Sequence, residues 1–183
     1  MTPVRSPDDP DLTVSSPALL EDGSDRRFRQ FVHDTLAFAA RIEEIRDRFG
    51  EFVGLTGSQY TILISIAHLQ DVEGVGVAAV VEHLHLSGAF VTIEVNKLVT
   101  AGFVEKRVNP GDRRRVLLTA TERARGLLAK LTGIQAPAND ALFGCLDAAG
   151  FQLMSTLMGK LVGCGDKALA LLDFQRAQAA GGD

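Results

Sequence analysis

The feature that most constrains this chain is a pair of short β-prone runs set between helical segments. Residues 103–108 (FVEKRV) and 115–119 (RVLLT) are joined by a turn that begins Asn-Pro-Gly, a sequence typical of tight turns. Three arginines, Arg113–Arg115, follow at the tip of this turn, although the whole chain has a net charge of −4. A run of charged residues usually forms only a solvated surface, so the flanking segments must indicate whether these arginines have a function.

Three short helices are predicted before the hairpin, at residues 58–70, 77–85 and 88–101. Thr56 and Gln59 have the spacing of a capping box, in which the two side chains satisfy free amides of the first helical turn. Ser87 is a favourable N-cap for the third helix. The second and third helices are joined by a tight turn, which is the helix-turn-helix pattern.

A fourth helix is predicted after the hairpin, over residues 122–131. Thr119 and Glu122 have the spacing of a second capping box. The order is therefore helix, helix, helix, β-hairpin, helix, which describes a winged helix-turn-helix over residues 51–131. In this fold the hairpin is the wing, and the arginine run lies at its tip.

Further helices are predicted on both sides of this domain. Residues 26–50 carry apolar or small side chains at alternating steps of three and four, which predicts one helix. Asp147 is a candidate cap in residues 132–180, where Gly163 and Gly165 predict a break between two helices. We expect both regions to form a dimerisation layer, although packing within one chain would also explain the stripe on 26–50. The apolar positions are Phe28, Phe31, Thr35, Phe38, Ile42, Ile45 and Phe49 in the first region and Leu153, Leu157 and Leu161 in the second.

The acidic charge is concentrated at the start of the chain. Residues 1–25 hold one arginine, six carboxylates and four of the six prolines, for a net charge of −5. Such a segment buries too little apolar surface to offset its ordering entropy, so we predict a largely disordered tail. The rest of the chain has a net charge of +1, and residues 103–119 have a local charge of +3. The overall acidity therefore does not exclude a polyanionic partner.

The remaining composition indicates an ordinary globular protein with 46% hydrophobic and 23% charged residues. No apolar run reaches the roughly 18 residues that a membrane helix needs, and the N-terminus lacks the pattern of a secretion signal. We therefore expect a cytoplasmic protein that does not interact with membranes. Cys145 and Cys164 are too few for a disulfide framework and lack the spacing of a metal or redox motif.

The stretch LVTAGFVEKRVNPGDRRRVLLTATERARGLL resembles the MarR (multiple antibiotic resistance) family of regulators. It contains an L-x-x-x-G-F-V exit from the recognition helix, a D-x-R wing tip and an L-T-x-x-E helix start, in that order. The resemblance covers roughly residues 27–165. It implies a homodimeric winged-helix transcription factor, and many members of this family respond to small molecules.

The resemblance implies that the helix beginning at Ser87 enters the major groove of duplex DNA. Thr92 and Asn96 can form hydrogen bonds with base edges, and Phe90 or Ile93 can meet thymine methyl groups. Packing within the domain is an equal alternative for these two apolar side chains. Family members often carry Arg or Lys where this chain has Ile93, which hints at a site rich in A·T pairs. The proposed recognition-helix residues are Ser87, Gly88, Ala89, Phe90, Thr92, Ile93 and Asn96.

The resemblance also implies that the wing reaches the adjacent minor groove. An aspartate that matches Asp112 tends to hold one arginine in this family while another enters the groove. We expect Arg113 or Arg114 to enter it, and Arg115 to contact phosphate together with Lys106 and Arg107. The alternative is a hairpin tip that is merely solvated.

A small-molecule effector is expected in a cleft between the dimerisation helices and the winged domain, as is common in this family. Phe38, Arg41, Ile42 and Tyr60 are candidates from their positions, with core packing as the alternative for each. No metal, cofactor or redox switch is expected, because the histidines lack the spacing of a metal site and the cysteines lie in apolar helical segments. No motif indicates catalysis.

These observations predict a sequence-specific DNA-binding regulator, acting as a homodimeric repressor on a pseudo-palindromic operator and released by a small organic ligand. The alternative is a winged-helix protein–protein interaction module, since the same helix can dock a protein partner. The arginine-rich wing favours double-stranded DNA as the partner. An enzyme is not expected.

Overall fold

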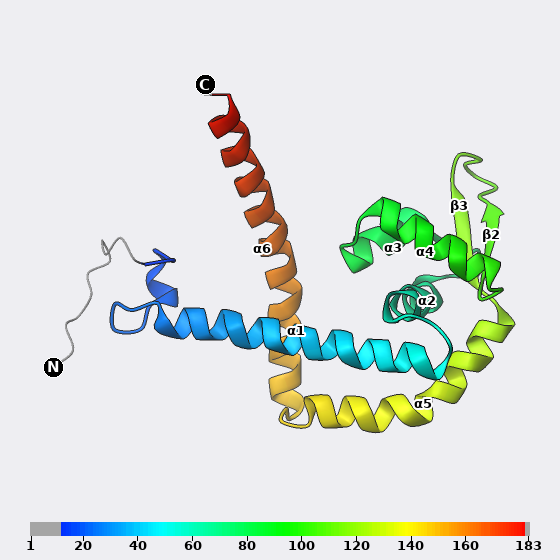
Figure 1. Cartoon of the computed structure of the whole chain (residues 1–183), viewed down its shortest axis with the longest axis horizontal. Coiled ribbons are helices and arrows are strands. Elements are labelled where there is room, and N and C mark those ends of the chain that lie inside the picture. Colours follow the sequence, from blue (N-terminus) through cyan, green and yellow to red (C-terminus); the bar gives the residue numbers. More distant parts are fainter. Residues whose placement is uncertain (1–11, 182–183) are drawn as a thin grey trace. The chain divides into compact units, whose positions relative to one another are not determined.

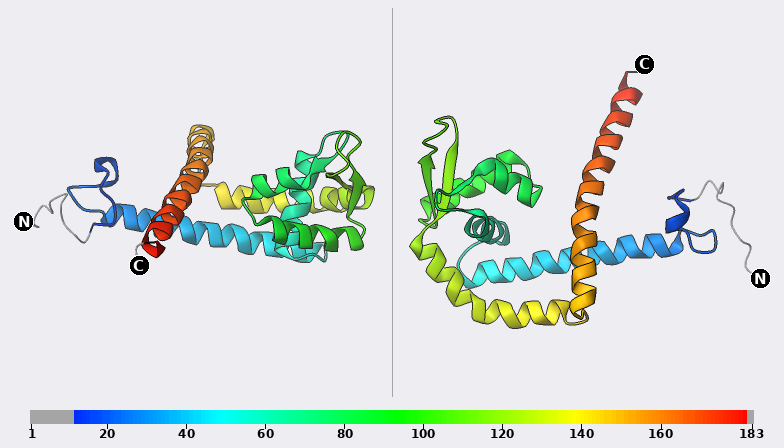
Figure 2. Two further views of the ribbon diagram at one scale, coloured as in Figure 1. Left: turned by 90° about the horizontal axis from the view of Figure 1, so that it is seen from above. Right: turned by 180° about the vertical axis from the view of Figure 1, so that it is seen from behind.

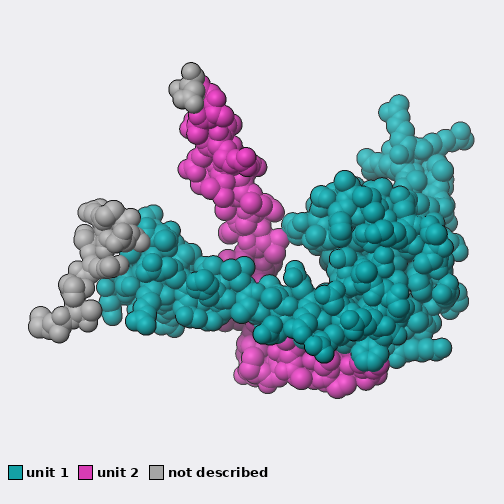
Figure 3. Space-filling model, in the orientation of Figure 1, with its two compact units in different colours: residues 1–132 teal, residues 133–183 magenta. Residues whose placement is uncertain are grey.

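The computed structural model describes residues 12–181 (Figure 1). The chain forms two compact units, one up to Thr132 and one from Gly133 onward (Figure 3). The fold is mainly helical with a small antiparallel sheet, which confirms the predicted class. The elements are η1 (Pro17–Leu19), α1 (Arg26–Phe52), α2 (Gly57–Leu69), β1 (Val75–Gly76), α3 (Val77–Leu84), α4 (Gly88–Thr100), β2 (Val104–Val108), β3 (Val116–Ala120), α5 (Glu122–Phe143) and α6 (Ala148–Ala180).

Local sequence signals fix the starts of α2 and α4 as predicted. The Thr56 hydroxyl accepts a hydrogen bond from the backbone N–H of Gln59, and the Gln59 side chain accepts one from the backbone N–H of Thr56, both at 3.2 Å. The Ser87 hydroxyl accepts from the backbone N–H of Phe90 at 3.2 Å. Both arrangements satisfy amides that a helix start would otherwise leave unpaired.

The second predicted capping box is wrong. Thr119 lies within β3, where it pairs with Glu105 of β2, so it cannot cap a helix. The cap of α5 is Thr121, whose hydroxyl accepts from the backbone N–H of Ala124 at 3.1 Å. Strand β3 therefore continues to Ala120, past the position at which the Thr119/Glu122 spacing predicted the helix cap.

The sheet has three strands in the order β1-β3-β2, and the sequence predicted only two of them. β1 is two residues long, too short to produce a periodic pattern, and Val75 pairs with Leu118. Gly74 makes this pairing possible. Its φ is +104°, and a Cβ there would lie 2.7 Å from the carbonyl oxygen of Leu118, so a larger residue would be strained and would clash.

The core of the first unit lies where α2 meets α3, α4 and β3 (Figures 1 and 2). Each large apolar side chain buried here contributes about 1.5–3 kcal/mol. Helix α1 joins this core at its C-terminal end, where Phe49 packs edge-on against Tyr60 with ring centroids 5.9 Å apart. The side chains with almost no exposed surface are Tyr60, Ile62, Leu63, Ile66, Val80, Val91, Val95, Leu98, Val104 and Leu118.

The stripe on α1 is covered unevenly. Phe49 is buried, whereas Phe31, near the start of the helix, is 56% exposed. Leu36 on the same half is 62% exposed. The covered half is the one that contacts α2, where Asp47 accepts a hydrogen bond from the backbone N–H of Gly57 and Phe49 packs on Tyr60. Part of the apolar stripe therefore belongs to the core, and part of it faces outward.

Residues 12–25 have a defined conformation in the structure, unlike the disordered tail predicted from composition. The buried carboxylate of Asp25 accepts hydrogen bonds from the backbone N–H and the hydroxyl of Thr13, at 2.9 and 2.7 Å. Arg29 forms an ion pair with it at 2.8 Å. Composition gives no sign of these specific contacts. The part of the predicted tail at residues 1–11 lies outside the described residues.

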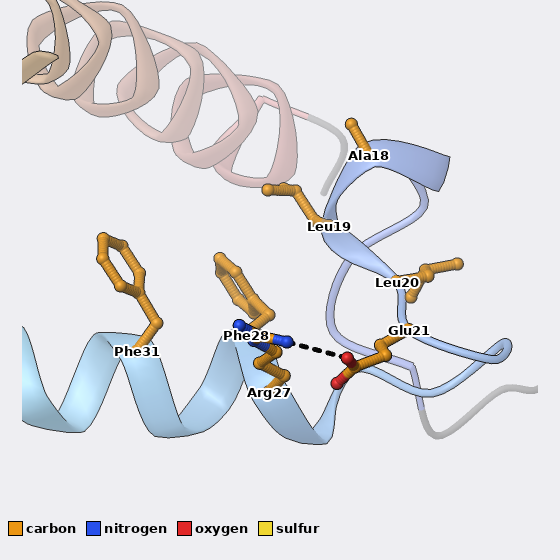
Figure 4. A pocket seen from close by; sticks show the side chains of 7 residues that line it. All are labelled: Ala18, Leu19, Leu20, Glu21, Arg27, Phe28 and Phe31. Atoms are coloured by element: carbon orange, nitrogen blue, oxygen red, sulfur yellow. Dashed lines mark hydrogen bonds and ion pairs between the residues drawn. The ribbon is translucent and has the colours of Figure 1, made fainter.

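A small apolar pocket forms where this segment meets the first turns of α1 (Figure 4). It has a volume of about 380 Å³. Arg27 and Glu21 form an ion pair at 2.7 Å beside it. The lining side chains are Ala18, Leu19, Leu20, Glu21, Arg27, Phe28 and Phe31.

The second unit contains the end of α5 and all of α6. Asp147 caps α6 as predicted, by accepting from the backbone N–H of Gly150 at 2.7 Å. The predicted break at Gly163 and Gly165 is wrong, since both glycines lie inside the continuous helix. Each glycine costs a helix about 1 kcal/mol, which is too little to end a helix of this length. No residue of α6 is buried within the described chain.

Within residues 12–181, no single helix is both long and apolar enough to cross a membrane. Three pairs of consecutive helices are long and apolar enough only when the two helices of a pair are counted together, and the chain bends within these pairs by 85°, 118° and 90°.

Candidate nucleic-acid interface

The helix-turn-helix is formed by α3 and α4, and the chain bends by 118° between them, close to the geometry of DNA-binding examples. His85, with φ of +51°, takes the left-handed conformation that ends α3. Val91, Val95 and Leu98 of α4 are buried. The other face of α4 is open to solvent.

All of the recognition residues predicted from the sequence lie on this open face. Phe90 and Ile93 are 37% and 54% exposed, so neither is used up by packing in the core. The Thr92 hydroxyl donates a hydrogen bond to the carbonyl of Gly88 at 2.7 Å, and the side chain is exposed. The exposed set is Ser87, Gly88, Ala89, Phe90, Thr92, Ile93 and Asn96.

The turn of the wing is built by two short polar side chains. The side-chain oxygen of Asn109 accepts from the backbone N–H of Gly111 at 2.8 Å, which reverses the chain after β2. Asp112 accepts from the backbone N–H of Arg114 at 3.1 Å and forms an ion pair with Nε of Arg115 at 3.2 Å. One carboxylate therefore shapes the tip and fixes one arginine.

The three arginines of the tip are not equivalent. Arg115 is held by Asp112. Arg113 and Arg114 are exposed, and within residues 12–181 no hydrogen bond or ion pair engages their guanidinium groups. The geometry thus leaves these two side chains available to an anionic partner.

Two other cations of the wing are engaged within the protein. Arg107 donates to the backbone carbonyls of Glu73, at 3.0 Å from Nε, and of Val72, at 3.4 Å. It therefore fastens β2 to the loop before β1. Nζ of Lys106 donates to the side-chain oxygen of Asn96. This contact joins the middle of β2 to the open face of α4, so the two predicted DNA-contacting elements share one surface.

One polar cluster beside this surface was not identified from the sequence. Glu94 is 6% exposed and accepts hydrogen bonds from Gln59 at 3.1 Å and from Lys97 at 2.7 Å. The hydrogen bond from Lys97 is the main cause of a lowered pKa of the Glu94 carboxyl; burial opposes this shift, and Gln59 adds to it. The spacing of Val91, Glu94, Val95 and Leu98 on one helical face was the available signal.

A larger cavity of about 460 Å³ separates α1 from the helix-turn-helix. Of the four predicted effector residues only Ile42 lines it. Tyr60 is 2% exposed and packs on Phe49, and Arg41 forms an exposed ion pair with Glu44 at 3.5 Å. Phe38 is half-buried on α1, outside the cavity. The lining residues are Ile42, Glu43, Arg46, Asp47, Gly57, Ser58, Thr61, Leu84, Leu86 and Phe90.

The cysteines differ from the apolar surroundings expected of them, because both Cys145 and Cys164 are exposed within the described chain. Within residues 12–181, no three His, Cys, Asp or Glu side chains lie together as a metal site would require.

Comparisons with known proteins agree with this geometry. The model of the MarR family matches residues 53–115, which include α2, the helix-turn-helix and most of the wing. No relative of the chain was found among curated proteins.

Solved structures share the fold at low sequence identity. A MarR protein from Peptoclostridium difficile is 19% identical with a TM-score of 0.64, and the match covers 75% of this chain and 88% of that one. A MarR variant from E. coli complexed with operator DNA is 18% identical with a TM-score of 0.60, covering 74% and 94%. An S. aureus MepR–DNA complex is 16% identical with a TM-score of 0.63, covering 73% and 97%.

The family match falls on the segment that carries the recognition helix and the wing tip. The solved MarR structures have the same fold over about three quarters of the chain. Residues 53–115 therefore carry a segment of the MarR family, within a chain that has the winged helix-turn-helix fold of the solved MarR structures.

Proposed function

We propose that this chain is a sequence-specific DNA-binding repressor that acts as a homodimer on a pseudo-palindromic operator and is released by a small organic ligand. One observation carries the DNA-binding part of this proposal. The contact between Asn96 and Lys106 joins the open face of α4 to the wing, so helix and wing can meet one duplex together.

The division of labour follows from the shape of DNA. A helix fits the major groove, where Thr92 and Asn96 can read base edges and Phe90 or Ile93 can contact thymine methyl groups. The open amide of Gly88, at the N-terminus of α4, can donate to a phosphate. Arg113 and Arg114 are long cations at a narrow tip, suited to the enhanced negative potential of a narrow minor groove.

The contacts inside the wing refine the assignment of the other cations. The ion pair with Asp112 fixes the orientation of the Arg115 side chain. We assign Arg115 to a contact with a DNA phosphate. The ammonium group of Lys106 can contact a phosphate while it donates a hydrogen bond to Asn96. Arg107 contributes mainly by holding β2 in place, because its guanidinium group donates to the carbonyls of Val72 and Glu73.

Relatives support the same partner. The E. coli MarR variant was crystallised with operator DNA, a Listeria monocytogenes family member with a DNA duplex, and S. aureus MepR as a DNA complex. The last two are 17% and 16% identical to this chain. Their complexes support DNA binding here through the shared fold.

Dimerisation is proposed through residues 26–50 and 132–180, on either side of the DNA-binding residues 51–131. An uncovered helix with large apolar side chains is costly in water. α6 has no buried residue and exposes Phe151, Leu153, Leu157, Leu161, Leu169, Leu172 and Phe174. A second copy would cover them and place two recognition helices about one helical turn, roughly 34–36 Å, apart on an inverted repeat.

Release by a ligand is proposed from the cavity between α1 and the helix-turn-helix. Phe90 lines this cavity and also belongs to the first turn of α4. An occupant would therefore touch both the proposed dimerisation helix and the recognition helix. Ile42 remains a proposed contact, Phe38 and Arg41 would contribute only through rearrangement of α1, and Tyr60 acts through the core. A regulator of this kind would act in the cytoplasm, where the DNA is.

Fluorescence anisotropy with duplex from the region upstream of the chain's own gene tests the proposal. Binding should be tighter than to a mixed-sequence duplex, should weaken steeply with salt, and should collapse in an Arg113→Ala/Arg114→Ala variant. A Lys160→Ala/Lys167→Ala variant loses the same charge on α6 and should bind like the wild type. Absent or salt-independent binding would favour the alternative, a protein–protein interaction module.

A further inference from the structure

Glu94 is a buried carboxylate on a helix that otherwise presents its polar groups to solvent. It lies on the same face as Val91, Val95 and Leu98 and is 6% exposed. Each of its two oxygens has its own donor: Oε2 accepts from Nε2 of Gln59 at 3.1 Å, and Oε1 accepts from Nζ of Lys97 at 2.7 Å. A charge at this depth is tolerated because it is paired and hydrogen-bonded.

Gln59 connects this carboxylate to the start of α2. Its side-chain oxygen accepts from the backbone N–H of Thr56 at 3.2 Å, so its amide nitrogen must be the group that faces Glu94. Its own backbone N–H donates to the Thr56 hydroxyl. The capping box of α2 thus extends to the middle of α4, and the rotation of α4 about its axis is fixed against α2.

Lys97 is the other partner, and it belongs to the open side of α4. It lies beside Ile93 and Asn96, and its side chain is 56% exposed. A lysine at this place would otherwise be free to contact a DNA phosphate. The ion pair directs its ammonium group back toward the protein. At neutral pH the carboxylate stays charged, since the pKa of Glu94 is lowered.

We infer that Glu94 is a positioning residue that increases discrimination between operator and non-specific DNA. It holds Lys97 away from phosphate and keeps the recognition helix in one orientation. Non-specific binding depends on phosphate contacts alone, whereas operator binding also depends on contacts with bases. Keeping Lys97 away from phosphate therefore weakens non-specific binding more than operator binding. This inference rests on the proposed DNA-binding function.

The salt dependence of binding to a mixed-sequence duplex tests the inference without knowledge of the operator. In Glu94→Gln the ammonium of Lys97 is released, so the variant should bind this duplex more tightly than the wild type at low salt. The slope of log K against log salt should steepen by about 0.9 per subunit, the value for one added phosphate contact. This corresponds to a roughly 3.5-fold greater loss of affinity between 50 and 200 mM salt for each added contact.

Matched variants separate this effect from charge and from folding. Glu105→Gln makes the same change of net charge at an exposed carboxylate of the wing and should not steepen the slope to this extent. Glu94→Gln/Lys97→Gln should return the slope to the wild-type value. Lys97→Gln alone should have the wild-type slope, and this holds as a test even if Glu94→Gln fails to fold.

The outcomes distinguish the inference from the proposal beneath it. An unchanged or shallower slope in folded Glu94→Gln, or a slope shallower by about 0.9 per subunit in Lys97→Gln, would overturn the role of Glu94 while leaving DNA binding intact. A wild-type protein that binds no duplex at low salt would overturn both.

Discussion

At the scale of single residues, the wing shows that cations close in sequence have different structural roles. Arg113 and Arg114 extend from the tip, Arg115 is paired with Asp112, and Arg107 donates to backbone carbonyls 34 and 35 residues away. The sequence analysis predicted that Arg107 contacts phosphate because its positive charge can be read directly from the sequence. The backbone carbonyls that accept its hydrogen bonds cannot be identified in the same way. Long-range backbone acceptors have no signature in the local sequence.

Arg107→Ala should therefore lower the stability of the protein more than its electrostatic affinity for DNA. Each lost hydrogen bond from a charged donor to an exposed carbonyl is worth about 1 kcal/mol, so the urea midpoint should fall. The salt slope of DNA binding should stay near the wild-type value. Urea titration and anisotropy on the same preparation check this. A normal urea midpoint with a shallower slope would make Arg107 a phosphate contact after all.

At the scale of elements, residues 12–25 and α6 mark the limits of composition and propensity. The acidic segment was predicted to be disordered from its proline and charge content, yet residues 12–25 fold around Asp25 through Thr13 and Arg29. In α6, two glycines predicted a break that does not occur. In residues 12–25, a few specific contacts have more effect than the average composition. In α6, the helical segments on both sides of Gly163 and Gly165 outweigh the low helix propensity of these two glycines.

The conformation of residues 12–25 should depend on pH through Asp25. Hydrogen bonds from Thr13 lower its pKa, with Arg29 acting in the same direction against burial. A carboxyl whose folded pKa is lowered stabilises the fold above its unfolded pKa of about 3.9 and loses this contribution as the pH falls through the lower folded value.

Urea midpoints measured from about pH 5 down to about pH 2 check this expectation. Asp25→Asn should lower the midpoint at the upper end of this range and flatten its pH dependence relative to the wild type. Asp71→Asn is a suitable control, because the Asp71 carboxylate accepts only local hydrogen bonds, from Glu73 and Gly74. Identical pH profiles for Asp25→Asn and the wild type would show that Thr13 and Arg29 add nothing to stability.

At the scale of the whole molecule, the apolar side chains of α6 bear on assembly. Leu157 and Leu161 lie one turn apart, and each is 47% exposed. Leu157→Glu/Leu161→Glu should weaken self-association on the order of a hundredfold or more, because two charges would have to be buried in the proposed interface. Sedimentation equilibrium over a concentration series measures this directly.

Val72→Glu is the matched control, since Val72 is 98% exposed in the first unit. It should leave the association constant unchanged. A wild-type monomer at all concentrations would contradict the proposed dimer, whatever the behaviour of the variants.

Sequence by itself determined the elements whose causes are local. The capping of α2, α4 and α6 by Thr56, Ser87 and Asp147 depends on side chains within three residues of the amides that they accept from. The inward face of α4 follows from helical periodicity, and the Asn-Pro-Gly turn and arginine tip of the wing are contiguous in the chain. These features were sufficient to predict a winged helix-turn-helix and its MarR resemblance.

Tertiary structure alone decided the features that depend on residues far apart in the chain. β1 exists because Gly74 allows its backbone to approach Leu118, and Tyr60 lies in the core because Phe49 packs against it. Gln59 reaches Glu94 only after α4 folds across α2. Hydrogen bonds and packing act over a few ångströms in space, so partners 11 to 44 residues apart become visible only once the chain has brought them together.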